Sequence, residues 1–182
     1  MAVTMADITH LRKMSGAGMM DCKKALEEAN NDFDKAMEII RKKGQAVAAK
    51  RSDREASEGC VLATENGDFA AVVALKCETD FVAKNADFVA LTQDILNAAM
   101  SNKPATKEEL LKMALSDGRS IENHITDRVG VTGEKMELGE YEYVKGASTV
   151  SYIHPGNKLA AIVAFNQELD HQVAREIAMQ VA

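Results

Sequence analysis

The sequence predicts an α+β fold, in which an N-terminal three-helix domain precedes a core of two α+β subdomains with antiparallel sheets, the second of them incomplete. Three observations support this fold class. Residues 1–44 carry apolar side chains at the three- and four-residue spacing of helices. Residues 60–77 are rich in Val, Leu and Ala and contain the pair Asn66-Gly67, which is typical of a β-hairpin. The composition changes at Gly59, so we expect a domain boundary there.

Short helices account for residues 1–44, which we expect to form one small domain. Thr4 begins a capping-box pattern, so the first helix is expected to start there. Asp32 is expected to cap the third helix and Gly44 to end it, because glycine favours the left-handed conformation of a helix C-terminus. Residues 45–58 have no sustained apolar stripe and are expected to be a linker, helical in part.

Residues 59–145 are expected to form the first core subdomain. After the hairpin, Asn85 has the position of a helix cap, and further helix starts are expected at Thr106 and Ser120. The last part of this segment alternates apolar and charged residues with the period of a strand. A bulge is expected in that strand at Gly139.

Residues 146–182 are expected to begin the second core subdomain. Strands near 148–153 and 158–165 flank a Pro-Gly-Asn turn, and a helix with one apolar face follows. The helical pattern meets no stop signal before the last residue, which indicates a fragment of a longer protein.

Charge and cysteine content restrict the class of protein. The net charge of −6 argues against a nucleic-acid-binding surface, which needs clustered Lys and Arg to neutralise phosphates. No apolar run approaches the roughly 20 residues of a membrane span. Cys22, Cys60 and Cys77 form no CxxC pair, which indicates a reducing compartment and no structural zinc. We therefore expect a cytoplasmic protein that binds no membrane, nucleic acid or metal.

Catalytic motifs are not evident in the sequence. The histidines are scattered and form no HExxH or Cys-His signature. The glycine-rich run at 15–18 precedes no Gly-Lys-Ser/Thr and follows no strand, so we expect a helix–helix turn rather than a phosphate-binding loop. We expect neither enzyme activity nor a cofactor.

Two groups of apolar residues allow two interpretations each. Met19 and Met20 are consecutive in the first turn of a helix, so both cannot face a core this small. Met19 lies on the apolar stripe of that helix and is expected in the core. Met20 is either an incidental surface residue or an adaptable contact for a partner. Phe81, on a loop after a strand, is either a plug on the core or a partner contact.

Two motifs resemble those of the elongation factor Ts family. The run LRKMSGAGMMDCKKALEEAN at 11–30 is similar to the N-terminal signature of this family, and CETDFVAKN at 77–85 is similar to its second motif. The KKG…AAKR…EG pattern between the motifs and the final IAMQVA also fit. The resemblance therefore covers the whole chain.

The resemblance implies a guanine-nucleotide exchange factor of translation elongation. Members of the family bind elongation factor Tu in its GDP-bound and nucleotide-free states, and disturb its Mg²⁺ and phosphate site so that GDP leaves and GTP can bind. Residues 1–44 would be a ubiquitin-associated-like domain that docks on this partner. The matching positions imply the following partner-binding residues: Leu11, Arg12, Met19, Met20, Lys23, Thr79, Asp80, Phe81, Val82, Val129, Gly130 and His154.

The chain departs from the family pattern in two respects. Ala74-Leu75-Lys76 replaces the Glu-Val-Asn that the family usually carries before the cysteine, which affects local polar contacts there. The dimerisation insert and the C-terminal module of the family are missing, so the expected oligomeric state is a monomer.

Two other classes of function stay open from the residues alone. An adaptor protein would use the three-helix domain as a ubiquitin-type binding module and would bind its partner without nucleotide exchange. An enzyme would need a nucleophile or a cofactor, of which the sequence gives no sign.

Overall fold

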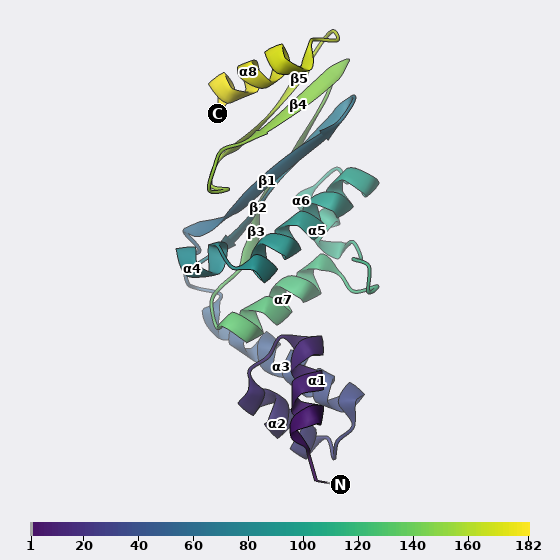
Figure 1. Cartoon of the computed structure of the whole chain (residues 1–182), viewed down its shortest axis with the longest axis vertical. Coiled ribbons are helices and arrows are strands. Elements are labelled where there is room, and N and C mark those ends of the chain that lie inside the picture. The colour runs from purple at the N-terminus through teal and green to yellow at the C-terminus, as the bar shows by residue number, and fades with distance from the viewer. Residues whose placement is uncertain (1) are drawn as a thin grey trace. The chain divides into compact units, whose positions relative to one another are not determined.

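The structure, a computed structural model, describes residues 2–182 (Figure 1). The chain folds into two compact units. Unit 1 comprises Met1–Glu55 and Ile125–Lys135, and unit 2 comprises Ala56–His124 and Met136–Ala182. Helices occur together with antiparallel strands, which confirms the predicted α+β class.

Three helices make up most of unit 1. They are α1 (Met5–Ser15), α2 (Met19–Glu28) and α3 (Phe33–Arg51). The predicted helix starts are confirmed, because Thr4 forms a capping box with Asp7 and the Asp32 side chain accepts a hydrogen bond from the Lys35 N–H at 3.1 Å. Small and aliphatic side chains form the shared core of the three helices: Ile8, Leu11, Cys22, Ala25, Leu26 and Ala36.

The prediction that Gly44 ends the third helix is wrong. α3 continues to Arg51, because the residues after Gly44 are mostly good helix formers such as Ala, Gln and Lys. Gly44 is buried, and it faces Gly130 of α7 (Ile121–Thr132). A Cβ placed on Gly130 would lie only 2.5 Å from the Gly44 Cα. Gly44 therefore permits the close approach of two helix backbones rather than the end of a helix.

Unit 2 contains a three-stranded antiparallel sheet with the strand order β1-β2-β3. Its strands are β1 (Glu58–Asn66), β2 (Phe69–Cys77) and β3 (Glu137–Lys145). Asn66 pairs with Phe69 across a tight turn, in which Gly67 takes a φ of 62°, so the predicted hairpin is confirmed. The expected bulge is confirmed as well, because the pairing of β2 with β3 skips Gly139.

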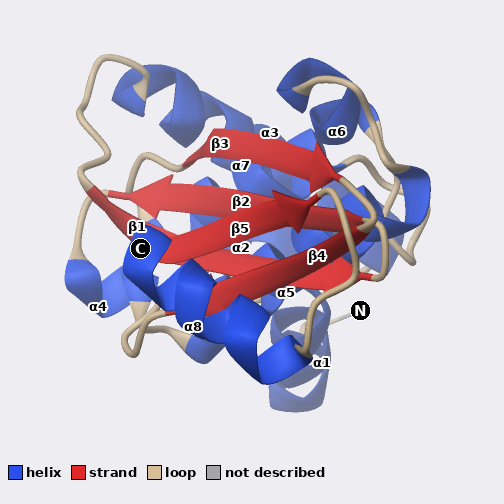
Figure 2. Cartoon of the chain, turned by 90° about the horizontal axis from the view of Figure 1, so that it is seen from above, coloured by secondary structure: helices blue, strands red, loops and turns tan. Residues whose placement is uncertain are grey.

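A second, two-stranded sheet lies across the first one (Figure 2). It consists of β4 (Ser148–Ile153) and β5 (Ala160–Phe165), and α8 (His171–Val181) follows it. The Ser151 N–H donates a hydrogen bond to Glu65 of β1 at 3.0 Å, which links the two sheets. α8 covers the outer face of the second sheet, where Ala174 and Ala178 pack around Val150.

Helices cover the other face of the three-stranded sheet (Figure 1). They are α4 (Asp80–Ala83), α5 (Ala86–Asn102) and α6 (Lys107–Lys112). All three predicted caps are confirmed, because the side chains of Asn85, Thr106 and Ser120 each accept a hydrogen bond from a first-turn N–H. Within residues 2–182, no helix has the length and apolar character needed to cross a membrane.

Candidate functional site

The segment around Phe81 forms a single-turn helix instead of the expected loop. Thr79 caps this helix, α4: its Oγ1 accepts a hydrogen bond from the Val82 N–H at 3.4 Å, and its carbonyl accepts one from the Ala83 N–H at 3.1 Å. Ala83 is buried. The loop prediction is wrong because four residues are too few to show helical periodicity. Phe81 therefore projects from a capped backbone with regular geometry.

Phe81 extends into solvent. The residue is 84% exposed, the highest value among the large hydrophobic residues within 2–182. Its interpretation as a plug on the core is therefore wrong. An exposed phenylalanine forgoes roughly 1.5–3 kcal/mol of burial free energy. The ring therefore offers apolar surface to solvent beside charged neighbours.

Asp80 forms an ion pair with a neighbour one helical turn away. The Lys84 Nζ lies 2.8 Å from the Asp80 Oδ2. This hydrogen bond, together with the Lys84 charge, lowers the pKa of Asp80 from its ordinary value. Both side chains are exposed, so the pair contributes little stability. The pair directs the Asp80 carboxylate toward Lys84, one turn along α4.

The turn between β4 and β5 lies beside the same strand as α4. The His154 N–H donates to the Leu159 carbonyl at 2.8 Å, which closes the turn. The Val61 N–H of β1 donates to the Asn157 carbonyl at 2.7 Å, which attaches the turn to the sheet. α4 also packs on β1. The structure therefore brings Phe81 and His154, which are distant in sequence, onto elements that share one supporting strand.

The ring of His154 is held in place by a neighbour on β4. Its Nδ1 lies 2.9 Å from the Tyr152 hydroxyl, and the two rings are tilted against each other with centroids 6.0 Å apart. His154 itself is exposed. The imidazole is therefore a fixed surface group with polar and aromatic character.

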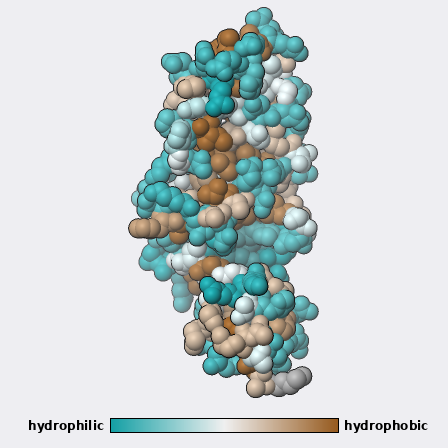
Figure 3. Space-filling view, viewed as in Figure 1, coloured by the Kyte–Doolittle hydropathy of each residue, from teal (hydrophilic) through white to brown (hydrophobic). Residues whose placement is uncertain are grey.

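Unit 1 carries a second exposed apolar surface at the start of α2. Met19 is 40% and Met20 64% exposed, because the core face of α2 is formed by Cys22, Ala25 and Leu26. The expectation that Met19 belongs to the core is therefore wrong, since it lies one turn before that core begins. In Figure 3, pale-brown residues of moderate hydropathy lie among teal hydrophilic ones in the region of unit 1.

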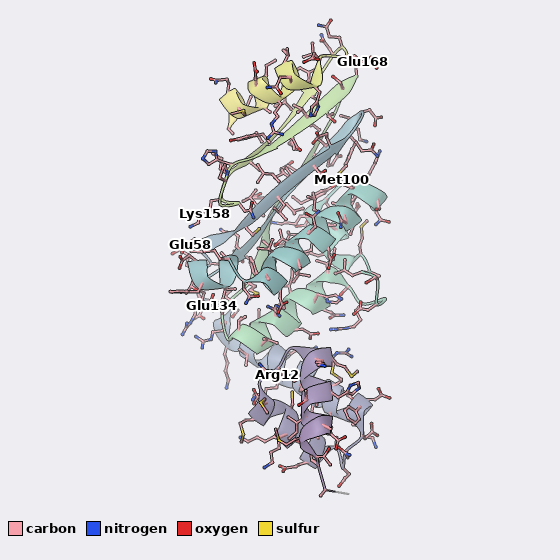
Figure 4. The ribbon with its side chains drawn as sticks, in the orientation of Figure 1. Arg12, Glu58, Met100, Glu134, Lys158 and Glu168 are labelled. Atoms are coloured by element: carbon pink, nitrogen blue, oxygen red, sulfur yellow. The ribbon has the colours of Figure 1, made fainter. Side chains whose placement is uncertain are left out.

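Two basic side chains accompany the methionines on unit 1. Arg12 lies in the last turn of α1 and is exposed (Figure 4). The Lys23 Nζ lies 3.7 Å from the Glu27 Oε1 on α2, and both side chains are about half exposed. An exposed pair of this kind is weak and exchanges readily for a partner's charges. Unit 1 therefore presents thioether and basic groups together.

Leu11, Val129 and Gly130 contribute to packing within unit 1. Leu11 is fully buried and Val129 is 3% exposed, so neither side chain is available on the surface. Gly130 provides the close approach to Gly44 described above. The Leu11 and Val129 side chains are therefore part of the interior of unit 1, and Gly130 lies at a helix–helix contact.

Lys158 and Glu58 are two residues of this region that the sequence analysis missed. The Lys158 Nζ lies 2.6 Å from the Glu58 Oε2, although the two residues are 100 positions apart. Figure 4 shows both of them beside α4. No local spacing could reveal this pair, because it forms only when the β4–β5 turn docks on the start of β1.

The cysteines, the possible metal ligands and one cavity are the other features that could carry chemistry. None of the three cysteines forms a disulfide and all three are buried, and burial raises the pKa of the Cys60 thiol. Within residues 2–182, no cluster of three His, Cys, Asp or Glu side chains could hold a metal ion. A cavity of about 190 Å³ inside unit 1 has apolar and ion-paired walls, with neither histidine nor cysteine in its lining. The exposed apolar side chains of the candidate site lie on α2 and α4.

The family model described as Elongation factor TS matches residues 78–182, which include α4, the β4–β5 turn and α8. The chain belongs to the elongation factor Ts family. The elongation factor Ts of Porphyromonas gingivalis is 75% identical over 182 residues, covering 100% of this chain and 66% of the relative. The elongation factor Ts of Bacteroides thetaiotaomicron is 63% identical over 183 residues, covering 100% of this chain and 55% of the relative.

Both exposed surfaces lie in segments of the chain that the comparisons match to the family. The α4 surface falls within the region that the family model covers, and the α2 surface falls within the full-chain alignments to elongation factor Ts relatives. A third member, from Azobacteroides pseudotrichonymphae, is 58% identical over 183 residues. The chain spans between about half and two-thirds of the length of these curated relatives.

Proposed function

We propose that this chain is a guanine-nucleotide exchange factor of translation elongation. It binds elongation factor Tu with GDP bound, disturbs the Mg²⁺ and phosphate site of that protein, and promotes GDP release so that GTP can bind. The observation that carries the proposal is the 84% exposure of Phe81 on a capped helix. Membership of the elongation factor Ts family supplies the class of partner.

Two surfaces divide the task between docking and release. On unit 1, Arg12, Met19, Met20 and Lys23 hold the factor on its partner, because flexible thioethers and basic groups adapt to a protein surface. On unit 2, the contact residues are Thr79, Asp80, Phe81, Val82 and His154. Among these, Thr79 and Asp80 position α4, and Phe81 enters the partner.

Thermodynamic linkage determines how much binding free energy the contacts of Phe81 must supply. A factor that weakens GDP binding to its partner must itself bind more weakly when GDP is present, by the same ratio. Each tenfold loss of GDP affinity needs about 1.4 kcal/mol of contact that exists only in the nucleotide-free complex. Burial of one phenylalanine supplies roughly 1.5–3 kcal/mol. A single inserted ring therefore accounts for one to two factors of ten.

The release step itself involves no bond-making by this chain. Insertion of Phe81 near the Mg²⁺ site of the partner displaces the ion, which is the counter-charge that holds the β-phosphate of GDP. The nucleotide then dissociates, and Asp80 takes no part in bond-making but helps to position α4. The function so described requires neither a cofactor nor an enzymatic group, and belongs to the cytoplasm, where translation takes place.

The test is the release of fluorescent GDP from elongation factor Tu in the presence of excess unlabelled nucleotide. Substoichiometric amounts of this chain should accelerate the release without hydrolysing nucleotide. Unchanged release at micromolar concentrations of folded chain would overturn the proposal. Tight binding without acceleration would instead support an adaptor. Sedimentation of the chain at several concentrations should show a monomer.

A further inference from the structure

We propose that Lys158 is a positioning residue, which holds α4 and its Phe81 ring against the end of the three-stranded sheet. The inference rests on the proposed function, because it assigns a purpose to the placement of Phe81. It is carried by one ion pair, the strand register beneath it and the short length of α4.

The ion pair joins two distant parts of unit 2. The Lys158 Nζ lies 2.6 Å from the Glu58 Oε2, and the two side chains are 55% and 33% exposed. Lys158 follows Asn157, whose carbonyl accepts the hydrogen bond from the Val61 N–H at 2.7 Å. The ammonium group is therefore carried by a turn that is already fixed to β1. The position of the Lys158 backbone is therefore fixed by the fold of the β4–β5 turn.

The strand register leads from this pair to α4. Glu58 pairs with Cys77, so Lys158 lies over the place where β2 ends. The Cys77 thiol donates a hydrogen bond to the Thr79 carbonyl at 3.2 Å. That same carbonyl accepts the Ala83 N–H, which closes the single turn of α4. A shift at Glu58 is thus transmitted to the cap of α4 through two adjacent contacts.

The charges around α4 agree with this role. The pKa of Lys158 is raised, mainly by its hydrogen bond to Glu58 and further by the charges of Glu58 and Asp80. The Lys158 charge in turn helps to lower the pKa of Asp80, after the larger contribution of Lys84. Lys158 is therefore attracted by the carboxylates on both β1 and α4.

A helix of four residues depends on such support. The backbone hydrogen bonds of α4 are few: the Ala83 N–H donates to Thr79, the Lys84 N–H to Asp80 and the Asn85 N–H to Val82. Isolated turns of this length are unstable in water, because nucleation fixes several dihedral angles for each bond gained. Local opening of α4 would let the Phe81 ring sample many directions and would weaken its insertion into the partner.

The experiment compares Lys158→Gln, Glu58→Gln, the double variant and Lys158→Arg with the unchanged chain. The first readout needs no partner: amide hydrogen exchange of Ala83 and Lys84 by NMR. An exposed ion pair is worth little, so we expect exchange to quicken about two- to fivefold in either Gln variant. The double variant should equal the single ones, and Lys158→Arg should match the unchanged chain.

The second readout is the titration of GDP release against factor concentration. Lys158→Gln should lower the maximal rate about two- to fivefold, in proportion to the loosening of α4, and leave the half-saturating concentration unchanged. Lys112→Gln is the control for charge, because Lys112 ends α6, which α5 separates from α4 along the chain. It should behave like the unchanged chain.

The two readouts separate failure of this inference from failure of the proposed function. If the unchanged chain does not accelerate GDP release, the proposed function fails, yet hydrogen exchange still tests whether Lys158 orders α4. If the Ala83 and Lys84 amides exchange equally fast in Lys158→Gln and in the unchanged chain, the positioning role is overturned. Additive effects in the double variant would also overturn it, because the two residues would then act separately.

Discussion

Replacement of Phe81 by alanine should strongly lower the proposed release activity and leave the fold intact. Because the residue is 84% exposed, its truncation creates no cavity, and the free energy of unfolding should change by less than about 0.5 kcal/mol. The fully buried Phe88 provides the matched control. Phe88→Ala should destabilise unit 2 by roughly 3–5 kcal/mol.

The effect of Phe81→Ala on GDP release follows from the area that the ring would bury. Covering a phenylalanine contributes roughly 1.5–3 kcal/mol, and each factor of ten corresponds to about 1.4 kcal/mol. If that contact forms only in the releasing complex, the maximal release rate should fall roughly 10- to 100-fold. The half-saturating concentration should change little, because unit 1 still docks.

The assay is a titration of GDP release against factor concentration, with a thermal melt of the same sample. A loss of plateau without a shift in melting temperature supports the reasoning. A wild-type plateau in Phe81→Ala would refute it, because the exposed ring would then have no part in release. A lowered melting temperature would show instead that Phe81 packs against the fold in solution.

Three further predictions concern other residues of the two units. Met20→Ala should raise the half-saturating concentration about five- to thirtyfold and leave the plateau nearly unchanged, as the same titration would show. Gly130→Ala should lower the unfolding free energy by roughly 1–3 kcal/mol in a denaturant titration, since its Cβ would lie 2.5 Å from the Gly44 Cα. By NMR, Asp80 should titrate below its ordinary pKa of 3.8. Because the folded-state pKa of Asp80 is depressed, the favourable interaction is fully present above the ordinary pKa of 3.8. It is lost as the pH falls through the folded-state pKa. Lys84→Gln should move the midpoint upward.

Local signals in the sequence were sufficient wherever the structure depends on neighbouring residues. The pair Asn66-Gly67 predicts the hairpin correctly, because a tight turn with positive φ favours glycine. Thr4 and Asn85 predict helix starts correctly, because a capping side chain satisfies N–H groups only a few residues away. Such features need no knowledge of the rest of the fold.

Non-local contacts explain what the sequence could not predict. Gly44 has the pattern of a helix end, but its partner Gly130 is far along the chain and decides its role. The ion pair of Glu58 with Lys158 is equally invisible to spacing arguments. In the candidate site, the motif indicated that Phe81 matters, whereas only the structure showed that it is exposed and helical.

The burial of all three cysteines, within the part of the chain that the structure describes, has a practical consequence for spectroscopy. Thiol-reactive dyes and spin labels react with accessible thiolates, so the native protein should take up little label. A cysteine introduced in place of Lys112 would then be the main reactive position. A fluorophore attached there would mark unit 2 at one main position, without prior removal of the native thiols.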